Sequence, residues 1–149
     1  MEFARIILNL FVGPSPWDEE DFEHLRSQGI TVILSLQTVE DVGERGLEAE
    51  ASTAKAAKVR FRNAPVADFD SDDLCRQLPA CVTKLKRLMD DGQTVYLHCT
   101  AGVNRSPTVA VAYLHWCLGW PLEQALTRMQ EARECCPLPD VIRRAHWSP

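Results

Sequence analysis

Residues Thr94 to Leu114 read TVYLHCTAGVNRSPTVAVAYL, and this is the most informative part of the chain. Its first four residues are β-branched, aromatic or apolar, which is typical of a buried strand. From Ser106 onward a proline in the first turn and a continuous apolar run predict a helix. The loop between them therefore lies at the carboxyl end of a strand and at the N-terminus of a helix. In α/β proteins this is where ligands bind.

The loop carries side chains suited to phosphate chemistry. The helix dipole and successive backbone N–H groups can surround an oxyanion, and the same field favours the nucleophilic thiolate of Cys99. Arg105 offers a planar guanidinium that can contact two phosphate oxygens. Ser106 can donate its hydroxyl to the sulfur when the thiolate leaves, and Gly102 allows a tight turn. His98 is expected to orient the loop through hydrogen bonds.

The order His98-Cys99, five residues, Arg105-Ser106 resembles the Cys-x5-Arg signature of the protein tyrosine phosphatases, and residues 101–108 look most like their dual-specificity branch. The resemblance implies that Cys99 attacks phosphorus and that water hydrolyses the resulting cysteinyl-phosphate, with no metal or cofactor. A module that binds phosphate without turnover is the alternative, against which Cys99 and Arg105 argue. The phosphoryl oxygens would be held by the backbone amides of Thr100, Ala101, Gly102, Val103, Asn104 and Arg105.

The reaction also needs an acid, because an alkoxide or phenoxide leaves slowly without a proton. The only dense acidic loop before the catalytic strand is residues 67–73, which read ADFDSDD. Asp68 lies close to where the dual-specificity family carries its general acid, so it is the preferred candidate and Asp70 is the rival. Asp72 and Asp73 are expected to cap the helix that starts near Leu74.

Nearly the whole chain resembles the catalytic domain of plant starch (glucan) phosphatases, which are relatives of laforin. In those enzymes the aromatic residue after the acid, here Phe69, helps to form a wide site for glucan chains. Those enzymes commonly read Gly-Arg-Ala where this chain has residues 104–106 as NRS, the form usual in protein-directed relatives. They also carry a tryptophan where residues 44–47 read ERGL. The segments that carry the resemblance are 12–13, 21–25, 33–37, 68–70, 78–80, 133–137 and 142–143.

The leading expectation is therefore a phosphatase acting on phosphotyrosine, phosphoserine and phosphothreonine in proteins. A phosphoglucan phosphatase is the alternative, and phosphoinositides are a further substrate class. The chain has 149 residues, 46% hydrophobic and 25% charged, which predicts one catalytic domain over residues 1–149 and a monomer. Its net charge of −5 and the lack of a long basic run argue against nucleic acid or membrane partners.

Cysteine spacing and the N-terminal residues bear on the compartment. The six cysteines include no Cys-x-x-Cys pair, which argues against a zinc site and suits a reducing environment. The first twelve residues carry an early acid and only a short apolar run, so they read as a strand rather than a signal peptide. A cytoplasmic enzyme is therefore expected.

The remaining patterns predict alternating strands and helices. Strands are expected within Arg5–Val12, Thr31–Leu36, Val59–Arg62 and Thr94–His98. This alternation predicts an α/β three-layer sandwich with a small, mainly parallel central sheet flanked by helices. The expected helices lie near residues 17–28, 48–57, 73–91, 106–118, 122–134 and 139–145.

Overall fold

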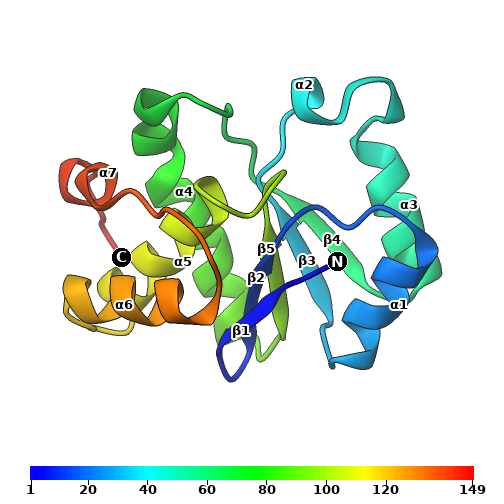
Figure 1. Cartoon of the computed structure of the whole chain (residues 1–149), viewed down its shortest axis with the longest axis horizontal. Helices are drawn as coiled ribbons and strands as arrows, with labels where there is room; N and C mark the ends of the chain where they lie inside the picture. The colour runs from blue at the N-terminus through cyan, green and yellow to red at the C-terminus, as the bar shows by residue number, and fades with distance from the viewer.

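A central sheet of five strands organises the molecule, as Figure 1 shows for the computed structural model, which describes residues 1–149. The strand order is β1-β2-β5-β3-β4, and every neighbouring pair is parallel except β1 with β2. This confirms the predicted α/β sandwich with a mainly parallel sheet. The strands are β1 (Ala4–Ile7), β2 (Leu10–Gly13), β3 (Val32–Ser35), β4 (Arg60–Asn63) and β5 (Val95–His98).

Helices cover both faces of the sheet (Figure 1). On one face lie α1 (Glu19–Ser27) and α3 (Leu47–Ala56). Side chains alternate along β5, so Tyr96 packs toward this face while Leu97 packs into the larger core on the other. The second face is covered by α4 (Ser71–Asp90), α5 (Arg105–Trp116), α6 (Leu122–Ala132) and α7 (Pro139–Arg144). No helix has the length and apolar character that crossing a membrane would need.

The structure corrects three local predictions. The strand expected over Arg5–Val12 is a hairpin of β1 and β2, because the chain turns at residues 8–9. Two short elements were not predicted, α2 (Val39–Val42) and the 3-10 turn η1 (Gly43–Arg45). The cap of α4 is Asp70, whose side chain accepts from the backbone N–H of Asp73, rather than Asp72 or Asp73. The Asp73 carboxylate instead accepts from the N–H of Ala67 and fixes the loop before the helix.

Strand register brings three carboxyl ends to one level. Gly13 of β2 and Ser35 of β3 both pair with His98, the last residue of β5. A Cβ at Gly13 would lie 2.4 Å from the hydroxyl oxygen of Tyr96, so only glycine fits there without rearrangement. The Tyr96 hydroxyl donates to the Pro14 carbonyl at 2.6 Å and fixes the turn after β2. The loops that follow β2, β3 and β5 therefore meet at one edge of the sheet.

Candidate active site

Cys99 lies directly after β5 at the base of the predicted phosphate-binding loop. The residue is only 3% exposed. Its Sγ lies 3.2 Å from the Oγ of Ser106, which comes from the first turn of α5. The serine hydroxyl is thus placed to donate a hydrogen bond to a thiolate. Sequence reasoning assigned this role to Ser106, and the structure brings the two side chains together.

The loop of residues 99–104 curls over the start of α5, and its amides are available to a ligand. None of the N–H groups of residues 100–104 donates to a backbone acceptor. Gly102 has a φ of +70°, and a Cβ there would lie 2.5 Å from the carbonyl carbon of Gly13. The close approach of this loop to the turn after β2 therefore requires glycine at position 102.

Arg105 is held along one edge of its guanidinium group. Its Nη1 donates to the Asp41 carboxylate at 2.8 Å and to the Val66 carbonyl at 2.7 Å. Its Nη2 donates to Thr100 Oγ1 at 3.2 Å and to Asp41 at 3.4 Å. The Nε atom is buried and has no hydrogen-bond acceptor. The protein thus fixes the Nη1 edge and leaves the Nε–H free for a phosphoryl oxygen.

Asp41 is a site residue that sequence reasoning missed. It closes a capping box with Thr38 at the start of α2, and its side chain is 9% exposed. Burial raises the pKa of this carboxyl, but the hydrogen bonds from Arg105 and from the Thr38 backbone outweigh burial and bring the pKa below its ordinary value. Asp41 is therefore a fixed anion that orients Arg105. The only sequence signal was the spacing Thr38-x-x-Asp41, which indicates a helix start rather than a catalytic role.

Glu50 is a second missed residue, and it explains how His98 supports the loop. The Nδ1–H of His98 donates to the Cys99 carbonyl at 2.8 Å, since a carbonyl oxygen only accepts. The Nε2 atom lies 2.6 Å from the Glu50 carboxylate, and both side chains are buried. The buried pair connects α3 to the catalytic loop.

The acidic loop before α4 places its candidates differently. Asp68 Oδ1 lies 3.3 Å from Arg105 Nε without the alignment of a hydrogen bond, and the Asp68 side chain is 30% exposed. Asp70 is occupied in capping α4. Between them Phe69 is 97% exposed and has a φ of +56°, a conformation that is uncommon for a bulky residue. Asp68, Asp70 and Arg105 all line one pocket of about 220 Å³.

Comparison with known proteins agrees with this geometry. Residues 15–142 match the family model of the dual specificity phosphatase catalytic domain. The chain is 33% identical to the chloroplastic phosphoglucan phosphatase LSF1 of Arabidopsis thaliana over 99% of its own length and 25% of that protein. It is 29% identical to dual specificity protein phosphatase 22 of Mus musculus over 89% of its own length and 65% of that protein.

Solved structures show the same fold. The crystal structure of PTPMT1 in complex with PI(5)P superposes with a TM-score of 0.77 at 20% identity, covering 95% of this chain and 90% of that one. The chain spans about a quarter of the length of LSF1, so it corresponds to one part of that relative. The family match covers the catalytic loop, Asp41, Asp68 and the loops around them. This chain belongs to the dual specificity phosphatase family.

Proposed function

We propose that the protein is a cysteine-dependent phosphomonoesterase. The observation that carries the proposal is the arrangement at the loop, which begins at the buried Cys99 thiol, has backbone amides that donate to no backbone acceptor, and ends at Arg105, whose buried Nε–H has no hydrogen-bond acceptor. The thiolate attacks phosphorus, the bond from phosphorus to the leaving oxygen breaks, and a cysteinyl-phosphate forms. Arg105 and the amides carry the charge that spreads over the phosphoryl oxygens, so the step works without a metal or cofactor.

We assign proton transfer to Asp68. As an acid it protonates the leaving oxygen, and as a base it then takes a proton from the water that attacks the cysteinyl-phosphate. The Ser106 hydroxyl, 3.2 Å from the sulfur, stabilises the departing thiolate. The position of Asp68 beside Arg105 Nε supports this assignment over Asp70, whose carboxylate caps α4.

We propose phosphorylated proteins as the substrate class. The polar reading Asn104-Arg105-Ser106 and the similarity to a dual specificity protein phosphatase favour this class. Hydrolysis of phosphopeptides carrying phosphotyrosine, phosphoserine and phosphothreonine is the expected activity.

A phosphoglucan is the second candidate, and exposed aromatic side chains favour it. Phe69 projects from one loop of the site, and Trp17 is 68% exposed on the loop after β2. The Arg45 guanidinium lies 4.1 Å from the centroid of the Trp17 ring and donates to the Trp17 carbonyl at 2.6 Å. Residues 44–47 thus contain no tryptophan themselves, but Arg45 packs over Trp17 from a neighbouring loop. Flat aromatic faces of this kind suit stacking against sugar rings, and LSF1 is named a phosphoglucan phosphatase.

Phosphate release measured side by side from phosphopeptides, phosphorylated amylopectin and phosphoinositides tests the substrate proposal. We expect phosphopeptides to be hydrolysed most efficiently, with little change in Trp17→Ala. Leu118→Ala is the matched control, because Leu118 is an exposed apolar residue beyond the end of α5. If phosphate were released fastest from amylopectin, and this activity were selectively lost in Trp17→Ala and Phe69→Ala, the substrate class would be phosphoglucans rather than phosphoproteins. No release from any substrate, aryl phosphates included, would contradict the enzymatic proposal itself.

We further propose that residues 1–149 form one catalytic domain that acts as a monomer in the cytoplasm, without nucleic acid or membrane partners. The net charge of −5 and six unpaired cysteines support this. Light scattering after size-exclusion chromatography checks the monomer. Imaging of the tagged protein in its own cells checks the compartment, and a plastid signal, as the name of LSF1 suggests, would contradict it.

A further inference from the structure

The carbonyl groups of the catalytic loop are all held from outside the loop. Each of the six carbonyls from Cys99 to Asn104 accepts a hydrogen bond, at distances between 2.7 and 3.1 Å. The donors, in order of the carbonyls, are His98 Nδ1, the Ser15 N–H, Arg133 Nη2, Arg133 Nε, the Cys136 N–H, and the N–H and hydroxyl of Thr108.

This pattern determines where the amides point. The peptide unit is planar and trans, so the N–H of one residue points opposite to the carbonyl of the residue before it. A carbonyl fixed on the outer side of the loop therefore turns the next N–H toward the inner side. Fixing the carbonyls of residues 99–104 aims the amides of residues 100–105, which are the donors that the proposed reaction uses.

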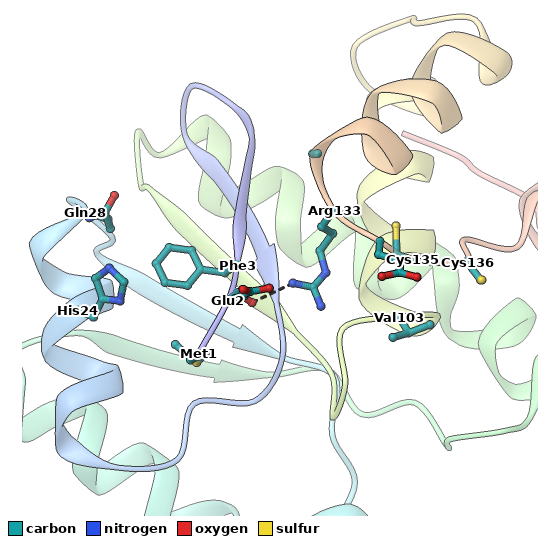
Figure 2. Close-up of a pocket in the computed structure, with 11 residues that line it drawn as sticks. Met1, Glu2, Phe3, His24, Gln28, Val103, Arg133, Cys135 and Cys136 are labelled. Carbon is teal, nitrogen blue, oxygen red and sulfur yellow. Dashed lines mark hydrogen bonds between the residues drawn. The ribbon is translucent and has the colours of Figure 1, made fainter.

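Arg133 holds two consecutive carbonyls and is the only side chain that does so in this loop. Its Nη2 donates to Ala101 and its Nε to Gly102, both at 3.1 Å. Its Nη1 donates to the Glu2 carbonyl at 2.9 Å, which anchors the guanidinium on the N-terminal segment. Figure 2 shows Arg133 reaching from the end of α6 toward Glu2, beside Val103 and the two cysteines that follow. The cavity they line has a volume of about 740 Å³ and lies outside the catalytic pocket.

We propose that Arg133 is a positioning residue that aims the amides of Gly102 and Val103 at the phosphoryl group. The proposal rests on the proposed phosphatase function and adds a residue that does not touch the substrate. Gly102 needs such support most, because a glycine has no side chain to restrict its backbone dihedral angles. Its φ of +70° is one of several conformations that it could adopt. Without Arg133 the two peptide planes are free to rotate, and the donors that stabilise the transition state lose their preorganisation.

Arg128 supplies a matched control. It lies on α6, and its Nε and Nη2 donate to the carbonyls of Ile6 and Arg5, both at 2.9 Å. It therefore makes the same kind of contact as Arg133, a guanidinium bound to two consecutive carbonyls, but on strand β1 instead of the catalytic loop. Loss of Arg128 removes two hydrogen bonds to backbone carbonyls and loss of Arg133 removes three, and only loss of Arg133 affects the loop amides.

The test compares Arg133→Lys and Arg133→Ala with Arg128→Lys and Arg128→Ala. We expect the Arg133 variants to lose about 10- to 100-fold in kcat on an aryl phosphate and to bind orthovanadate correspondingly more weakly. The reason is that misdirected backbone amides supply only part of the rate enhancement that a well-placed transition-state donor gives. The Arg128 variants should stay within threefold of wild type. Guanidinium chloride at millimolar concentration should partly restore Arg133→Ala, and potassium chloride should not.

Three outcomes are distinguishable. If the Arg133 and Arg128 variants lose stability equally and keep the same kcat and vanadate affinity, Arg133 is a structural anchor only and the proposal is overturned. If Arg133→Ala does not fold, the backbone amide resonances of Gly102 and Val103 in Arg133→Lys decide: vanadate should shift them less than in wild type, and an equal shift would overturn the proposal. If wild type neither hydrolyses aryl phosphates nor binds vanadate, the proposed function fails instead.

Discussion

Replacement of Arg105 by lysine separates the two tasks that the structure gives this side chain. The Nη1 edge is bound to Asp41 and Val66, and the Nε–H is free for substrate. A lysine ammonium is a single point charge. It can remain with Asp41 and the Val66 carbonyl, or it can reach the phosphoryl group, but it cannot do both. Arg105→Lys should therefore fold and bind phosphate weakly.

The expected loss can be worked from these contacts. The variant loses the Nε–H donor to the phosphoryl group, and one such transition-state donor supplies about 10²–10³ in kcat. We expect a loss of at least that size on an aryl phosphate, with a small change in melting temperature because Asp41 keeps a cationic partner. Arg105→Met should instead lower the free energy of unfolding by about 3–5 kcal/mol, since Asp41 is 9% exposed and would be left buried without a counter-ion.

Steady-state kinetics, vanadate inhibition and thermal melting of the purified variants measure these effects together. A folded Arg105→Lys enzyme with kcat within a few-fold of wild type would contradict a role of the Arg105 Nε–H in binding the phosphoryl group. It would mean that the guanidinium serves only to hold Asp41 and Val66 in place.

Further predictions concern the acid, the fixed anion and the thiols. Asp68→Asn should slow hydrolysis of alkyl phosphates by roughly 10²–10⁴-fold and hydrolysis of nitrophenyl phosphate much less. Asp70→Asn should mainly weaken the cap of α4. If Asp70→Asn instead showed this kinetic loss and Asp68→Asn did not, Asp70 would be the acid. The pKa of Asp41 lies below its ordinary value of 3.8, so its stabilising effect is full above that value and is lost as the pH falls through the lower folded-state pKa. The difference in melting temperature between wild type and Asp41→Asn should shrink over that acidic range, and a constant difference would contradict the ion pair. Iodoacetate at neutral pH should alkylate Cys99 before Cys81, because burial raises the pKa of Cys81 to about 12; equal rates in peptide mapping would contradict this.

The parts of the site that lie within one continuous stretch were predictable from sequence. The strand, loop and helix from Thr94 to Leu114 follow from local patterns, and Cys99, Arg105 and Ser106 lie within that unit. The parallel sheet follows from strands alternating with helices. The chemistry of Cys99, Arg105 and Ser106 depends on residues close to them in the sequence, so it can be predicted from the order of residues.

The residues that hold this unit in place could not be predicted in the same way. Asp41 is 64 positions from Arg105, Glu50 is 48 from His98, and Arg133 is 31 from Gly102. Each lies in a helix or turn where a charged residue is unremarkable, and its role depends on tertiary packing. Arg133 belongs to a segment that carries the family resemblance, but the resemblance did not indicate a function for it. The turn at residues 8–9 was missed for a related reason, since an apolar run does not specify where a hairpin reverses.

In the proposed mechanism Cys99 carries the phosphoryl group during turnover. Rapid quenching of the enzyme with an aryl phosphate, followed by digestion and mass spectrometry, measures this directly. We expect a phosphoryl group on the peptide that contains Cys99. We expect none in Cys99→Ser, which should still bind vanadate through the loop amides and Arg105 while losing turnover. Turnover without phosphocysteine, or activity of Cys99→Ser within tenfold of wild type, would contradict this mechanism.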